Sequence, residues 1–267
     1  MAITTLAGAV AGELQPVTFT KTTPNSANTW FDTWNSAVGA GTNVTASANG
    51  STYSSTSAQV AGQLRHQDPA TGNSYISTLK GRMSPVGTTA SVCAMLVDRL
   101  WQGGTYPATT TASQAITTPT FPARDINGST NGDGVLIYAA ATTNFTATTT
   151  ITITYTNQAG TGSRTGTCTL TSITAGFSDF LSLQSGDTGV RSIQAVAVGA
   201  AQAAGAYILV AVRPLLLHTL DTGCKTSCDD VITMGMPRLY DGSVPYILIR
   251  GQGANVRFVG AYVETTG

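Results

Sequence analysis

The chain has 267 residues, of which 10% are charged, and its 13 basic and 13 acidic residues cancel to a net charge of zero. An average soluble domain has about 25% charged residues, so solubility here does not rest on net charge, and residence in an assembly is favoured over free diffusion. Only three basic residues are lysines and the arginines are spread singly, so no basic stripe indicates a nucleic-acid partner.

Threonine and glycine dominate the composition, with 46 and 29 residues respectively. Threonine is β-branched and suits a pleated sheet, while turn dipeptides such as NG and DG separate strands. Glutamate, a good helix former, occurs only at Glu13 and Glu264. The composition therefore predicts a mainly β protein with many short strands.

Residues 1–40 are predicted to form an extended N-terminal arm. Its start lacks a positive charge before the apolar run, so it does not resemble a secretory signal, and synthesis and assembly in the cytoplasm are expected. The arm carries an aromatic cluster of Trp30, Phe31 and Trp34. Large aromatic side chains bury their area where they can, so we favour rings that fold back onto the main domain. The alternative is that they anchor the arm on a neighbouring subunit.

Residues 41–112 are predicted to be a small β-rich region, which could belong to the main body. Residues 41–62 are small and polar, as in a hairpin or an ordered loop. Residues 74–83 alternate as in a strand, whereas the apolar stretch 91–101 is compatible with either a buried strand or a helical turn.

Residues 113–267 show a steadier pattern of strands bounded by Gly, Pro, Asn or Asp, as in a β-sandwich or jelly roll. The apolar stretch 193–212 reaches the length of a membrane span, but two strands joined at GAAQAAG fit it better. No membrane association is therefore expected. The strands are predicted at 115–121, 134–141, 149–156, 165–170, 180–184, 190–198, 205–214, 244–251 and 255–264.

The clearest of these patterns is a hairpin over residues 148–167. Ile151, Ile153 and Tyr155 share one strand face, because side chains alternate with period two. The opposite face of the hairpin carries only threonines, and it has no Lys or Glu of the kind that usually guards a surface strand. Its predicted members are Thr150, Thr152, Thr154 and Thr156 on the first strand and Thr165, Thr167 and Thr169 on the second.

The residues that could carry catalysis or bind metal are few. His66 and Asp68 could form a dyad, although HQDP reads more simply as a turn, and His218 follows an apolar run. The loop 124–134 spaces oxygens as a calcium loop does, but Thr130 and Leu136 replace the Gly and Glu of an EF-hand, which favours a plain turn. We therefore predict no catalytic residues, no metal and no cofactor.

The four cysteines form no recognisable disulfide framework. Cys224 and Cys228 are the only close pair, and two thiols in a loop are favoured over a zinc half-site because no second pair completes four ligands. A local disulfide between them remains the alternative if the protein meets an oxidising environment.

Five segments together resemble a group of structural proteins of tailed bacteriophages, which are encoded among head-morphogenesis genes. The segments are HQDPATGNSYISTLKGRMS (66–84), LVDRLWQGG (96–104), TFPARDINGSTNGDGV (120–135), LQSGDTGVRSIQAV (183–196) and GMPRLYDGSVPYILI (235–249). The resemblance implies a non-enzymatic virion component, a head decoration or cement protein with a jelly-roll-like body that binds the major capsid protein or other virion proteins. It transfers no functional residues.

Two further expectations concern assembly and alternatives. A homo-oligomer is expected, and a trimer would suit the threefold positions of a shell. The alternative function is a tail or fibre component that binds host surface glycans. A glycan hydrolase would need paired carboxylates, and no pair can be named.

Overall fold

The structure is a computed structural model, and it describes residues 3, 5–22, 29–33, 51–52, 64, 66, 68–85, 92–117, 120–172, 176–220, 226–230, 235–251 and 256–267. In this part of the chain one short helix is accompanied by strands. The elements are α1 (Leu6–Ala11), β1 (Val17–Thr22), β2 (Thr29–Asp32), β3 (Ser51–Thr52), β4 (Ser74–Pro85), β5 (Val92–Pro107), β6 (Gln114–Ala115), β7 (Leu136–Thr143), β8 (Thr149–Asn157), β9 (Arg164–Leu170), β10 (Gly176–Phe177), β11 (Val190–Val198), β12 (Ala206–Leu220), β13 (Thr226–Asp229), β14 (Arg238–Leu239), β15 (Pro245–Gly251) and β16 (Val256–Thr266).

The strands form three sheets, which we call A, B and C. Sheet A has the order β1-β16-β4-β13, with β14 also pairing with β4. Sheet B has the order β10-β2-β15-β5-β12-β7, with β3 also pairing with β5, and sheet C has the order β6-β11-β8-β9. The predicted mainly β, jelly-roll-like sandwich is confirmed.

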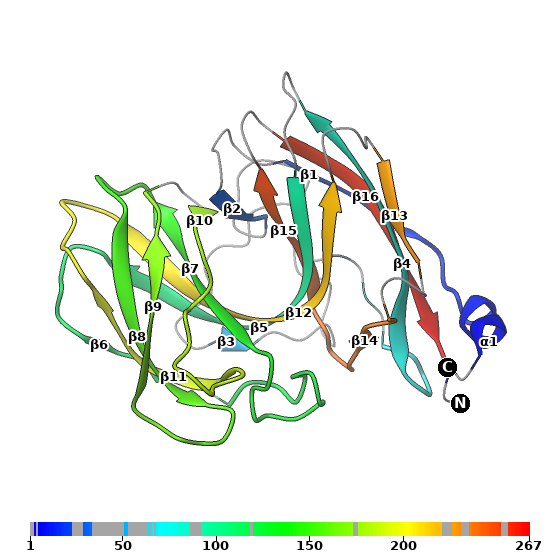
Figure 1. Cartoon of the computed structure of the whole chain (residues 1–267), viewed down its shortest axis with the longest axis horizontal. Helices are drawn as coiled ribbons and strands as arrows, with labels where there is room; N and C mark the ends of the chain where they lie inside the picture. The colour runs from blue at the N-terminus through cyan, green and yellow to red at the C-terminus, as the bar shows by residue number, and fades with distance from the viewer. Residues whose placement is uncertain are drawn as a thin grey trace.

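Sheet B is the shared layer of the molecule, because its two longest strands, β5 and β12, curve from one half to the other (Figure 1). At one end its side chains pack against sheet C, around Trp101, Ile153 and Leu209. At the other end they pack against sheet A, around Leu96, Phe258 and Ile247. Sheet B also curls on itself and encloses a third cluster. One sheet therefore contributes to every part of the core.

Most predicted strands are confirmed, and residues 92–101 of the ambiguous stretch lie in strand β5. Residues 199–205 connect β11 to β12, which confirms two strands at GAAQAAG. No helix in the described ranges has the length and hydropathy of a membrane span. Residues 180–184 are not a regular strand, because only Ser182 bridges to Thr167. Of the strand expected at 115–121, Ala115 lies in β6, and the other described residues, 116–117 and 120–121, are not in a strand.

The expected N-terminal arm contributes strands to two sheets. β1 pairs with β16 at the edge of sheet A, and β2 lies between β10 and β15 in sheet B. β4 and β5, from the expected middle region, pair with β16 and β12. Strands from all three expected segments therefore pair with one another, so residues 40 and 112 do not separate sheets. Most of residues 41–62 lie outside the described ranges.

The hairpin of β8 and β9 gives a direct test of the two strand faces. Ile153→Ala removes a fully buried side chain of the core between sheets B and C. We expect the free energy of unfolding to fall by about 2–5 kcal/mol, from lost apolar burial and the cavity left behind. Urea unfolding measures this loss: the midpoint urea concentration should fall while the m-value stays unchanged.

The matched control is Thr152→Ala, the neighbouring residue on the exposed face. It should change the free energy of unfolding by about 1 kcal/mol or less, the range of strand propensity. Equal losses for the two variants would contradict the assignment of faces.

Candidate interaction surface

The outer side of sheet C carries the threonine face, defined by Thr150, Thr152, Thr154 and Thr156 of β8 and Thr165, Thr167 and Thr169 of β9. Thr150 lies opposite Thr169, Thr152 opposite Thr167, and Thr154 opposite Thr165. Cross-strand pairs of this kind place side chains about 4.5–5.5 Å apart at Cβ. All seven residues are exposed or half-buried, so the uncharged face predicted from the sequence is present.

Small uncharged residues extend this face onto the next strand. Ala197 of β11 lies opposite Thr152, Ala195 lies opposite Thr154, and Ser192 lies opposite Thr156. The arginines of these strands, Arg164 and Arg191, lie at the end nearest the β8–β9 turn. At the opposite end of the face, the Thr169 hydroxyl donates to Asp179 Oδ2 at 3.2 Å. The charged groups therefore lie at the two ends, and the middle of the face carries small residues without charge.

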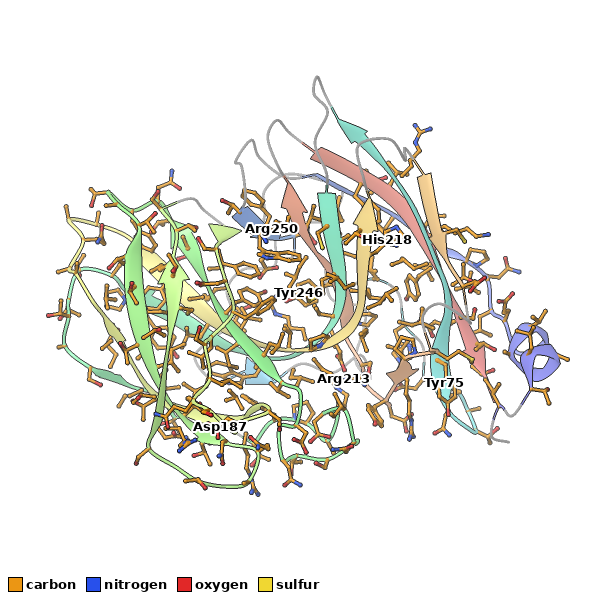
Figure 2. The ribbon with its side chains drawn as sticks, in the orientation of Figure 1. Tyr75, Asp187, Arg213, His218, Tyr246 and Arg250 are labelled. Carbon is orange, nitrogen blue, oxygen red and sulfur yellow. The ribbon has the colours of Figure 1, made fainter. Side chains whose placement is uncertain are left out.

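Asp187 fixes the turn end of sheet C. Its carboxylate accepts hydrogen bonds from Tyr155 Oη at 2.6 Å and Asn157 Nδ2 at 2.7 Å, both on β8. It also accepts from Nε and Nη2 of Arg164 on β9, each at 3.0 Å. One carboxylate therefore joins both strands of the hairpin to the loop before β11 (Figure 2). These hydrogen bonds, from Arg164 first and then Tyr155 and Asn157, lower the pKa of Asp187 to about 2.

The lowered pKa of Asp187 predicts a pH dependence of stability. The stabilisation is complete above the unfolded pKa of about 3.9 and is lost as pH falls towards about 2. We therefore expect the stability difference between wild type and Asp187→Asn to be constant above about pH 5 and to shrink below it. Thermal unfolding between pH 2 and pH 6 measures this difference.

The control for this series is Asp241→Asn, at an exposed aspartate. The stability difference between wild type and this variant should not shrink in the same way across that pH range. A wild-type advantage over Asp187→Asn that is undiminished at pH 2 would contradict the assignment.

The aromatic cluster of the expected arm lies largely inside the chain. Trp30 is 8% exposed and Phe31 is fully buried. The Trp30 ring stacks on Phe177 with centroids 6.2 Å apart. The two rings thus leave little surface for a neighbouring subunit, and the anchoring role stays a prediction without support from them. Trp34 lies outside the described residues.

The loop 124–134 is a turn organised by its own aspartate. The Asp125 carboxylate accepts hydrogen bonds from backbone N–H groups of Asn127, Ser129, Gly132 and Asp133, and from the Ser129 hydroxyl. Its oxygens are thus engaged by donors of the loop itself, as favoured from the sequence. Among the described residues no cluster of His, Cys, Asp or Glu could hold a metal ion.

The cysteines and histidines are placed as follows. Cys168 is buried and Cys228 is exposed. Cys224 lies outside the described residues, so a disulfide between Cys224 and Cys228 stays untested. His218 is buried in β12. His66 does contact Asp68, with Nε2 and Oδ1 3.1 Å apart, so the reading of HQDP as a simple turn is incomplete.

Five buried charged side chains meet at the middle of β5 and β12, where the two halves join; Arg213 is labelled in Figure 2. We call this group the ionic hub, and its members are Asp32, Asp98, Arg99, Arg124 and Arg213. Asp98 of β5 lies opposite Arg213 of β12, and register shifts flank this pair. Pro214, which cannot donate a ladder hydrogen bond, follows directly. The charged groups therefore lie where the ladder is already interrupted and the strands bend.

Asp98 contacts groups from three other parts of the chain. Its carboxylate lies 3.2 Å from Nε of Arg124 and 3.4 Å from Nη2 of Arg213. It also accepts from the Ser243 hydroxyl at 3.0 Å and from the Val244 backbone N–H at 2.8 Å. All three charged side chains are almost completely buried, so each depends on the others for compensation.

Asp32 compensates Arg99 in the adjoining part of the hub. Arg99 Nη1 donates to Asp32 Oδ2 at 3.2 Å, and Tyr138 Oη donates to the same oxygen at 2.7 Å. Since Tyr138 gives its one proton to Asp32, Tyr246 must donate to Tyr138 across their 2.6 Å contact. Burial, together with the charge of Asp32, raises the pKa of both tyrosines well above their ordinary value, so they remain neutral donors.

The sequence signal for this hub is a pair of opposite charges, Asp98 and Arg99, inside the apolar stretch 91–101. Buried charges need partners. The partners lie far away in the chain, at Asp32, Arg124 and Arg213, and no local pattern marks them.

The ionic hub predicts that removing the Asp98 carboxylate strongly lowers the free energy of unfolding. Asp98→Asn leaves Arg124 and Arg213 buried without their shared carboxylate. We expect the free energy of unfolding to fall by about 3–5 kcal/mol, as for other broken buried pairs. Denaturant unfolding at neutral pH measures the loss.

Asp241→Asn is again the control and should stay within about 0.5 kcal/mol of wild type. A loss below about 1 kcal/mol for Asp98→Asn would show that the arginines are compensated elsewhere.

No protein-family model and no curated protein matches the chain. Among solved structures, it aligns with infectious bursal disease virus, Gx strain, at 10% identity and a TM-score of 0.21, covering 95% of this chain and 81% of that chain. The VP2 subviral particle of the same virus aligns at 12% identity and a TM-score of 0.20, covering 96% and 81% respectively. TM-scores of this size do not show a shared fold, so nothing from that virus is carried over.

Proposed function

We propose that this chain is a non-enzymatic structural protein of a tailed-bacteriophage virion, a decoration or cement protein that stabilises the head by binding the major capsid protein. The threonine face is the observation that carries the proposal. A freely diffusing protein usually guards exposed sheet surfaces with charge, and the middle of this face has none. Such a face suits permanent contact with another protein.

The chemistry of the face supports a contact role. Threonine offers a methyl group for apolar burial and a hydroxyl for hydrogen bonds, and the centres of protein interfaces are depleted of charge. The hydroxyls of Thr165 and Thr169 already bond to Gln184 and Asp179 within the chain. The Asp187 contacts and the core behind Ile151 and Ile153 hold the hairpin in place before any partner binds. A prearranged surface loses little conformational entropy on association.

The resemblance of five segments to structural proteins of tailed bacteriophages supplies the biological setting. It supports location in the virion, and with it assembly in the host cytoplasm. A homo-oligomer is proposed as well, and the trimer is proposed from the threefold symmetry of a shell. The major capsid protein is the proposed partner because head decoration proteins act on the assembled shell.

The test is binding of the purified protein to expanded heads that lack it, measured by co-sedimentation. Thr152→Lys combined with Thr154→Lys places two charges in the middle of the threonine face, so we expect at least a tenfold weaker binding. That loss corresponds to about 1.4 kcal/mol or more. Folding should be unchanged because both side chains point away from the core.

The control is Thr219→Lys, an exposed threonine on β12 of sheet B. It should bind heads as wild type does. Failure of the wild-type protein to bind heads, or its location on the tail by electron microscopy, would contradict the proposed function. Unchanged binding of the double variant would reject the threonine face as the contact surface.

A further inference from the structure

His66 lies buried between two carboxylates from different parts of the chain. Its Nδ1 is 2.9 Å from Glu264 Oε2 of β16, and its Nε2 is 3.1 Å from Asp68 Oδ1. The His66 side chain is fully buried, Glu264 is 5% exposed and Asp68 is 26% exposed. The imidazole therefore bridges the C-terminal strand and a segment 198 residues away in the sequence.

Both carboxylates are held in place by other groups. Glu264 Oε1 accepts from the Tyr262 hydroxyl at 3.0 Å, and Asp68 Oδ1 accepts from the Gly242 backbone N–H at 2.7 Å. Asp98 also acts on His66 electrostatically, but it is paired with Arg124 and Arg213. The groups whose charge His66 must balance are thus Glu264 and Asp68.

The two contacts require a particular protonation state. A neutral imidazole has one N–H and one bare nitrogen, so it can donate to only one of two carboxylates. The other nitrogen would then turn a lone pair towards a negatively charged carboxylate, which is unfavourable. His66 Nδ1 forms a hydrogen bond with Glu264, whereas Nε2 lies at ion-pair distance from Asp68 without a hydrogen bond. The positive charge of the imidazolium therefore compensates both carboxylates, which a neutral ring does not.

The end of β16 that carries Glu264 also supports the N-terminal helix. Leu14 N donates to Glu264 O at 2.8 Å, and Thr266 N donates to Gly12 O at 3.0 Å. The Thr265 hydroxyl donates to Ala9 O of α1 at 2.5 Å. α1 and both chain ends lie together at this edge of the molecule (Figure 1). Any movement of the end of β16 would therefore reach α1.

We propose that His66 is a proton-dependent clasp. In its doubly protonated form it joins the end of β16 to Asp68, and loss of its proton loosens that end together with α1. This inference is independent of the proposed function in the virion.

The direction of the pH dependence follows from the surroundings of His66. Burial alone would lower its pKa, but the hydrogen bond and charge of Glu264 and the charges of Asp68 and Asp98 raise it above the ordinary value of 6.5. A raised pKa in the folded state gives stabilisation that is complete below the unfolded pKa and is lost as pH rises through the folded pKa. The clasp is therefore closed at mildly acidic pH and opens on alkalinisation.

The test starts from the full-length protein and the histidine Cε1–Hε1 signals in its NMR spectrum. The chain has only two histidines, so His218→Gln assigns both signals directly. We expect His66 to titrate above pH 6.5, and to titrate lower in Glu264→Gln and in Asp68→Asn. Each unit of pKa shift corresponds to about a tenfold change in the folding equilibrium.

Hydrogen exchange gives the structural readout. Corrected for intrinsic exchange rates, protection of the Val263–Thr266 amides should fall as pH passes the pKa of His66, while amides in the centre of β12 stay protected. In Glu264→Gln and Asp68→Asn this step should shift to lower pH, and in His218→Gln it should remain.

Two outcomes would overturn the clasp: a His66 that titrates at or below pH 6.5, or a protection step at the same pH in wild type, Glu264→Gln and Asp68→Asn. If His66→Gln folds, its stability deficit relative to wild type should be largest at mildly acidic pH and shrink as pH rises. If it does not fold, the Glu264 and Asp68 variants decide the question alone.

Discussion

Three buried arginines meet two buried aspartates where β5 and β12 bend, and the joining of the two halves depends on this compensation. Arg99 is paired with Asp32, while Arg124 and Arg213 share Asp98. Each charge would be costly to bury alone. Because these residues come from β2, β5, β12 and the loop before β7, the pairing selects one arrangement of distant segments. The apolar clusters on either side supply burial, and the hub specifies how they are joined.

In sheet C, packing of the inner face stabilises the hairpin without charged side chains on its outer face. Its inner side contributes Ile151, Ile153 and Tyr155 to the core, so the hairpin needs no stabilising charge on its outer side. Asp187 adds directional contacts at the turn end. The threonine face is consequently available as a rigid, neutral surface, which links the packing of the sheet to the proposed role in an assembly.

The stability contributed by Asp187 and the stability contributed by His66 depend on pH in opposite directions. Asp187 has a lowered pKa, so its contacts fail in acid, whereas His66 has a raised pKa, so its contacts fail on alkalinisation. Asp187 belongs to sheet C, and His66 contacts the end of β16 in sheet A. The two ends of the molecule are therefore expected to loosen under different conditions.

The sequence by itself determined the local features: the mainly β class, most strands, and the threonine and core faces of β8 and β9. These follow from period-two alternation, which depends only on neighbouring residues. Only the tertiary structure decided the burial of Trp30 and Phe31, the partners of Asp98 and Arg99, and the contact of His66 with Glu264. These depend on segments far apart in the sequence, and single residues such as Asp32 or Glu264 carry no local signal of the charge they compensate.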